Sequence, residues 1–154
     1  MKDTVKNSWP RLLGTNAKTL KSSKVGALVA SHQLSPATES VPFGGVNMCA
    51  EASKGCSAAC LKNAGMNVMP THLDARVRRT LYWLRYPDLY HAQFNKELAA
   101  HKRKAARLKL EPWARPNTLS DQPELAIRCS EENQDMKFYD YTKRLKWWTK
   151  NDHR

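Results

Sequence analysis

The sequence predicts a single small α/β domain in which a partial parallel sheet is flanked by helices. A chain of 154 residues fits one domain, a short apolar run at 24–30 suits a buried strand, and helical and strand-like patterns then alternate. Such alternation is typical of parallel sheets, and in these sheets ligands bind at the C-terminal ends of the strands. We therefore expect the polar loops that follow the strands to lie on one rim of the domain.

Composition divides the chain into three parts. Residues 1–23 are polar and basic and are predicted to form an irregular arm. Residues 24–142 hold the periodic apolar segments and form the α/β core, which includes a cysteine loop at 47–65. Residues 143–154 are a basic, aromatic tail. The segment at 32–45 is rich in Pro, Gly and Ser, so we expect a loop that connects the first strand to the cysteines.

Two helices are predicted after the cysteine loop. The first begins near Thr71 and is expected to bury one face, formed by Leu73, Val77, Leu81 and Leu84. The second begins at Pro87, because proline is favoured at the first helical position, and runs to about residue 108. Its inward residues are predicted to be Tyr90, Phe94 and Leu98.

The last third of the chain contains shorter elements. Residues 113–115 are predicted to form a short strand between prolines, and 117–121 a polar loop. Residues 124–134 favour a short helix over a strand. Residues 136–142 alternate and are aromatic, and they give the clearest strand signal of the sequence.

Three of the four cysteines, Cys49, Cys56 and Cys60, fall within twelve residues at spacing C-x6-C-x3-C. Thiolates are soft ligands that select zinc, copper(I) or iron–sulfur clusters. Three of them leave one coordination position open, as catalytic metal centres do. We therefore predict a metal or cluster site at these three residues, with Cys129 outside it.

Other readings of the cysteines stay open. Cys56 and Cys60 are four residues apart and suit one buried helix face, and four cysteines also permit three disulfide pairings. The N-terminus is polar and lacks the apolar core of a signal peptide, so we expect a reducing cytoplasm, where metal or catalytic roles are the commoner use of such clusters. No apolar run is long enough to span a bilayer, and no membrane partner is expected.

The chain is strongly basic, with 26 Lys and Arg against 14 Asp and Glu and a net charge of +12. A field of this sign attracts nucleic acid or an acidic protein surface. Each basic run is equally compatible with a solvated helix face, and the tryptophan pair with a hydrophobic latch of the tail. The candidate nucleic-acid contacts are Lys102, Arg103, Lys104, Arg107, Lys109, Lys143, Arg144, Lys146, Trp147 and Trp148.

The sequence resembles the gene product 88 family of phage and prophage proteins over nearly its whole length. The most specific motifs are the cysteine block at 45–65 and the Tyr-Asp-Tyr-Thr-Lys block at 139–143. The resemblance implies a phage origin and a place in the cytoplasm of a bacterial host. The shorter motifs that also carry it lie at 16–21, 34–36, 75–80 and 120–121.

The family layout also resembles a reduced radical S-adenosylmethionine barrel. That likeness implies a 4Fe–4S cluster on Cys49, Cys56 and Cys60, and S-adenosylmethionine oriented by the polar motif after the next strand. By this likeness Asn117, Ser120 and Asp121 are the candidate cofactor-binding residues. Asp140 and Tyr141 are the catalytic candidates facing the substrate. The alternative is a basic, non-catalytic binding module that holds zinc or no metal.

Overall fold

A four-stranded sheet in the order β1-β2-β3-β4 organises the part of the chain that this computed structural model describes, residues 9–15 and 17–144. The strands are β1 (Leu13–Gly14), β2 (Ala27–His32), β3 (Glu111–Arg115) and β4 (Lys137–Phe138). β2, β3 and β4 are parallel, with Val29 opposite Trp113 and Ala114 opposite Phe138. The predicted α/β class and parallel sheet are confirmed.

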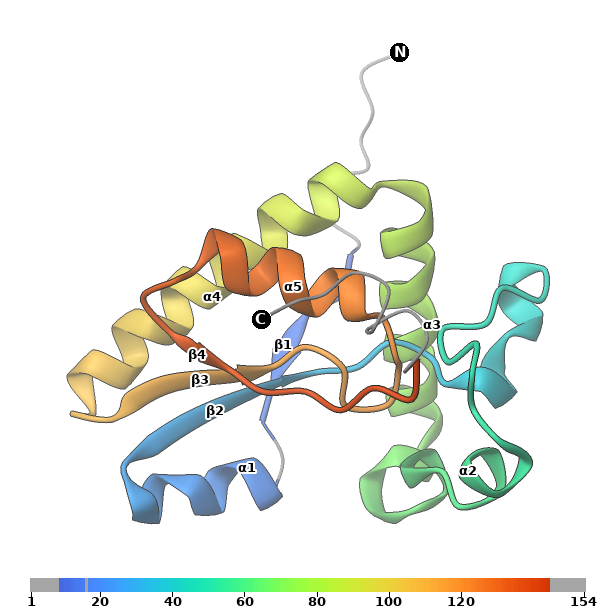
Figure 1. The fold of residues 1–154 in the computed structure, drawn as a ribbon, viewed down its shortest axis with the longest axis horizontal. Coiled ribbons are helices and arrows are strands. Elements are labelled where there is room, and N and C mark those ends of the chain that lie inside the picture. The colour runs from blue at the N-terminus through green and yellow to red at the C-terminus, as the bar shows by residue number, and fades with distance from the viewer. Residues whose placement is uncertain (1–8, 16, 145–154) are drawn as a thin grey trace.

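The helices pack on both faces of this sheet. They are α1 (Ala17–Lys21), α2 (Lys54–Ala58), α3 (Pro70–Arg85), α4 (Pro87–Arg107) and α5 (Pro123–Glu132). Figure 1 shows α4 and α5 over one face, α1 on the opposite side, and α2 and α3 near the ends of the strands. None of the helices in the described ranges combines the length and apolarity needed to cross a membrane.

The second predicted helix, α4, provides the centre of the core as expected. Tyr90, Phe94 and Leu98 are each fully buried, and their spacing of four places them on one face of the helix. Pro87 occupies the first turn, where its missing N–H costs nothing. The same core also contains Leu125 and Cys129 from α5, so the predicted helix in that region is confirmed.

The predicted inward face of α3 was wrong. Leu73 and Leu84 are 41% and 38% exposed, whereas Arg76, Thr80 and Tyr82 are buried. The buried polar residues are satisfied individually, because the Arg76 guanidinium donates to the Glu39 carboxylate at 2.7 and 3.1 Å and the Thr80 hydroxyl donates to a carbonyl within α3. Helical spacing of leucines therefore pointed to the wrong stripe, since specific tertiary partners decide which side is buried.

The predicted irregular arm contains regular structure within its described residues. Leu13 pairs antiparallel with His32, so β1 is an edge strand that the sequence did not predict. The Glu97 carboxylate of α4 accepts the backbone N–H groups of Leu12 and Leu13, at 2.8 to 3.1 Å. A charged side chain from α4 therefore fixes a segment whose own sequence carries little strand signal.

Two predicted strands have different bounds. β2 begins after Gly26, whose φ of 83° ends a short 3-10 turn, and extends to His32 rather than stopping at residue 30. The clearest predicted strand, 136–142, is reduced to Lys137–Phe138. The chain leaves the ladder at Asp140, because its carboxylate turns to accept the backbone N–H of Asn117 at 2.9 Å.

Candidate functional site: a three-thiol pocket

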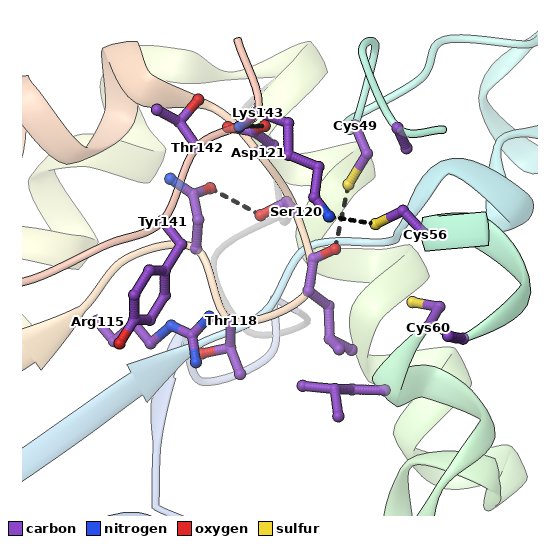
Figure 2. Close-up of a pocket in the computed structure, with 15 residues that line it drawn as sticks. Cys49, Cys56, Cys60, Arg115, Thr118, Ser120, Asp121, Tyr141, Thr142 and Lys143 are labelled. Atoms are coloured by element: carbon purple, nitrogen blue, oxygen red, sulfur yellow. Dashed lines mark hydrogen bonds between the residues drawn. The ribbon is translucent and has the colours of Figure 1, made fainter. Parts of the chain in front are cut away.

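A cavity of about 330 Å³ opens at the C-terminal ends of the parallel strands. Three segments surround it, as the βα alternation predicted: the cysteine loop, the loop after β3 and the segment after β4 (Figure 2). The lining residues are Cys49, Ala52, Cys56, Ala59, Cys60, Leu61, Arg115, Asn117, Thr118, Leu119, Ser120, Asp121, Tyr141, Thr142 and Lys143.

All three clustered cysteines line this cavity as half-buried free thiols. Cys129, in α5, is also a free thiol but lies in the core, so the disulfide reading is not realised. Cys56 is held in α2, where the Ser53 hydroxyl accepts its backbone N–H at 3.1 Å. Cys60 follows the end of α2, so Cys56 and Cys60 do not share one buried helix face.

Two of the thiols have defined polar partners. The Cys49 thiol donates to the Leu119 carbonyl at 3.2 Å, and burial raises its pKa to about 11. The Lys143 ammonium lies 2.7 Å from the Cys56 sulfur, and this contact raises the pKa of Lys143. Figure 2 shows the Lys143 side chain extending to Cys56. The pocket thus brings a cation to one thiol while Cys49 is a neutral thiol at neutral pH.

Asn117 holds the loop after β3 in shape. Its side-chain amide donates to the Asp140 carboxylate and the Gln122 carbonyl, at 2.9 and 2.8 Å. Its side-chain oxygen accepts from the Ser120 hydroxyl at 2.8 Å. Asn117 and Ser120 therefore line the pocket with polar atoms that already pair within the loop.

Asp121 connects all three segments. Its backbone N–H donates to the Met48 carbonyl beside Cys49, at 2.8 Å, and its carboxylate oxygen Oδ2 accepts the Lys143 backbone N–H at 2.7 Å. The other carboxylate oxygen, Oδ1, has no hydrogen bond from the described residues, and the residue lines the cavity. Of the three residues predicted to bind the cofactor, Asp121 is therefore the one whose carboxylate has an oxygen available to accept a hydrogen bond from a ligand.

The two catalytic candidates separate in the structure. Asp140 is not among the lining residues; burial raises its pKa to about 6, and its carboxylate accepts from Asn117. Its geometry is that of a residue that positions the loop. Tyr141 does line the cavity, is 70% exposed, and has the Arg115 guanidinium 5.0 Å from its ring centroid.

Sequence reasoning missed Arg115 and Thr118, which also line the cavity. Arg115 ends β3 and Thr118 lies in the loop beyond it, so both follow from the rule that ligands meet the C-terminal ends of strands. The sequence did carry a signal for Arg115, because it is a charged residue at the end of the predicted strand 113–115. It was interpreted only as part of that strand.

His32, at the end of β2, fixes the backbone between Arg115 and Asn117. Its Nδ1–H donates to the Pro116 carbonyl at 2.7 Å, and its Nε2 accepts from the Tyr90 hydroxyl. The ring is fully buried, and burial lowers its pKa to about 3. His32 is therefore a neutral anchor that connects α4 to the rim of the pocket.

Within residues 9–15 and 17–144, the members of the two basic runs do not form one surface. The run in α4 precedes β3 and the pocket follows β3, so they lie at opposite ends of that strand. Lys102 pairs with Asp135 at 2.8 Å, whereas Arg103, Lys104, Arg107 and Lys109 are exposed.

The second basic run divides in the same way. Lys143 lines the pocket and Arg144 donates to the Glu124 carboxylate at 2.9 Å, so each already has a role within the described residues, and their predicted contacts with nucleic acid stay predictions. Lys146, Trp147 and Trp148 lie outside the described residues, so their predicted contacts stay predictions.

The three thiols line one cavity without converging on a point. Among residues 9–15 and 17–144, no group of three His, Cys, Asp or Glu side chains is close enough to hold a single metal ion. Neither the cluster nor the zinc prediction therefore has a preformed group of three ligands in this part of the chain, and both stay predictions.

Fold and pocket together define a small α/β protein with a three-thiol pocket at the C-terminal ends of a parallel sheet. The chain belongs to the gene product 88 family, whose model matches residues 10–153, so the family resemblance drawn from the motifs is confirmed. Comparisons with curated proteins and with solved structures give no match.

Proposed function

We propose that this protein binds an iron–sulfur cluster through Cys49, Cys56 and Cys60, and a small polar ligand of the S-adenosylmethionine type in the adjoining part of the cavity. The observation that supports this is the placement of three thiols from one segment around a cavity whose other walls are polar loops. Iron–sulfur clusters are held by cysteine thiolates, so the donor set fits in kind.

The cavity has room for a cluster as well as for a single ion. Its volume of about 330 Å³ is about ten times the share of one water molecule in the liquid. In a cluster each iron takes its own cysteine, so three thiols on one cavity wall fit that donor set in kind. Such a cluster supplies one-electron chemistry at the iron that no protein thiolate holds.

The chain's own residues have distinct tasks in this proposal. Cys49 must lose its proton to become a ligand, and its raised pKa makes binding dependent on pH. Lys143 places its ammonium 2.7 Å from the Cys56 sulfur, beside the position of that cluster ligand. Asp121 offers its second carboxylate oxygen to a ligand amino group, while Asn117 and Asp140 keep the loop in position.

Anaerobic purification followed by visible absorption and iron and sulfide analysis tests the proposal. We expect a brown protein with iron and sulfide in matched amounts, lost in Cys49→Ala, Cys56→Ala and Cys60→Ala. Cys129→Ala is the matched control and should keep the metal, because Cys129 lies in the core. A colourless protein with about one zinc per chain would select the zinc alternative. Folded protein without metal would overturn both.

A second function, contact with nucleic acid, has its own support in the exposed basic end of α4. Arg103, Lys104, Arg107 and Lys109 are exposed, and no hydrogen bond or ion pair joins their side chains to the described residues. Cations at a helix C-terminus also suit the helix dipole, so exposure alone does not require a ligand. For duplex DNA, the logarithm of the binding constant should fall by about 0.9 for each phosphate contacted when the salt concentration rises tenfold.

Matched variants separate the two explanations of this surface. Replacing Arg103, Lys104 and Arg107 by alanine should reduce the salt slope of DNA binding, measured by fluorescence anisotropy. Lys102→Ala should reduce it less, because Lys102 already pairs with Asp135. An unchanged slope in the triple variant would assign the run to a solvated helix face.

A further inference from the structure

The pocket has a second end, away from the cysteines. Arg115, Thr118 and Tyr141 form it, and Figure 2 shows them together on the side of the cavity opposite Cys56 and Cys60. Arg115 ends β3, Thr118 lies in the loop after it, and Tyr141 lies in the segment after β4.

Arg115 is a largely buried cation with unused donors. Its side chain is 18% exposed, and its guanidinium makes no hydrogen bond to any residue in the described ranges. The nearest carboxylate, Asp140, is 4.0 Å from Nε, which is an ion pair without a hydrogen bond, and that carboxylate is occupied by Asn117. A guanidinium presents five N–H donors in a planar fork that matches carboxylate and phosphate oxygens.

Thr118 adds a second unused polar group. Its hydroxyl oxygen is buried and has no hydrogen-bond partner among the described residues, although the residue lines the cavity. A buried hydroxyl without a partner carries a desolvation cost that a ligand oxygen can relieve. Two orphan polar groups on one cavity wall indicate that the wall faces a polar ligand.

The sign of the charge indicates which ligand. Arg115 and Lys143 line the cavity, against the single carboxylate of Asp121. Asp121 already accepts a backbone N–H on one oxygen, and Tyr141 leaves its ring 70% exposed beside the guanidinium. A cation next to an exposed aromatic ring suits a ligand that joins an oxyanion to a planar group.

We propose that Arg115 and Thr118 form an oxyanion subsite at this end of the pocket, which binds a phosphate or carboxylate of the ligand while Tyr141 packs against its planar part. Arg115 binds the oxyanion through its N–H fork and Thr118 donates its hydroxyl. This assignment does not depend on whether the thiols hold a cluster.

Two matched ligand pairs test the subsite by isothermal titration calorimetry. AMP against adenosine isolates a phosphate, and S-adenosylmethionine against its decarboxylated analogue isolates a carboxylate. We expect one pair to show at least about tenfold tighter binding of the oxyanion-bearing member, because hydrogen bonds between charged groups contribute on that scale. The pair that discriminates identifies the source of the oxyanion. Equal affinities within both pairs, or no binding of either oxyanion ligand at millimolar concentration, would overturn the proposal.

Variants assign the effect to the residues. Arg115→Gln should remove the discrimination and Arg115→Lys should restore part of it. Arg103→Gln removes the same charge from exposed α4 and should change nothing; an equal loss there would mean a long-range field and overturn the assignment.

If Arg115→Gln fails to fold, Thr118→Val carries the test. It removes a hydroxyl that has no partner, so it should fold normally and still weaken oxyanion binding severalfold. Unchanged binding in a folded Thr118→Val variant would exclude Thr118 from the subsite. The same titrations on metal-free Cys49→Ala protein show whether the subsite binds oxyanions without a cluster. Failure of the subsite can then be told apart from failure of the cluster proposal.

Discussion

His32 should make the stability of this protein depend on pH in a way that one substitution removes. The imidazole is fully buried and its pKa falls from 6.5 to about 3 because burial disfavours the charged ring. Between these two values the unfolded chain binds a proton that the folded chain does not. Stability from His32 is therefore fully present above about pH 6.5 and is lost as pH falls toward 3.

The magnitude follows from the two pKa values. At pH 5 the unfolded histidine is almost fully protonated and the folded one is neutral, so folding loses about 2 kcal/mol relative to pH 7.5. The comparison variant is His32→Gln, which keeps polar groups near the Pro116 carbonyl and the Tyr90 hydroxyl but does not titrate. The unfolding free energy of the wild type minus that of the variant should therefore fall by about 2 kcal/mol when the pH is lowered from 7.5 to 5.

Urea denaturation monitored by circular dichroism at pH 5 to 7.5 measures this difference. Tyr90→Phe is the control: it removes the hydroxyl that donates to His32, at a cost of about 1 kcal/mol, but keeps the ring buried, so the pH dependence should remain. A wild-type to His32→Gln difference that stays flat with pH would refute the reasoning, because it would mean that the ring titrates equally in both states.

Three further outcomes are expected from the same denaturation assay. Arg76→Ala leaves Glu39 as an unpaired, largely buried carboxylate and should destabilise the fold by about 3 to 5 kcal/mol, whereas a loss below about 1 kcal/mol would show that water reaches the pair. Phe94→Ala opens a cavity beside α4 and should cost about 3 to 5 kcal/mol, and an unchanged urea midpoint would contradict its place in the core. Asp140 has its folded pKa raised from 3.8 to about 6. Wild type should therefore lose stability relative to Asp140→Asn by about 1.4 kcal/mol per pH unit as pH rises from about 4 to 6, with a plateau above. A difference without that slope would place the carboxylate in water.

The class of the fold and the segments that meet at the pocket could be predicted from the sequence. Alternating strand and helix patterns require parallel strands with crossovers, and parallel strands place their C-terminal ends at one rim. The cysteine segment, the loop at 117–121 and the segment 140–143 were therefore predicted to meet, and residues of all three line one cavity, although Asp140 does not. The helix α4 was also fixed locally, since Pro87 and the spacing of its aromatic residues define its start and its buried face.

The role of each of these residues at the pocket depends instead on contacts between segments that are distant in the sequence. Residue type suggested Asn117 as a cofactor ligand and Asp140 as a catalytic group, but their polar atoms pair with each other, which depends on two segments 23 residues apart. The buried face of α3 depends in the same way on Glu39, and β1 depends on Glu97. Arg115 became a site residue because its guanidinium is left without a hydrogen bond at the cavity wall. Spacing along a chain can place residues at one rim, but hydrogen-bond satisfaction is a property of three-dimensional neighbours, and it separates residues that hold a pocket from residues that face a ligand.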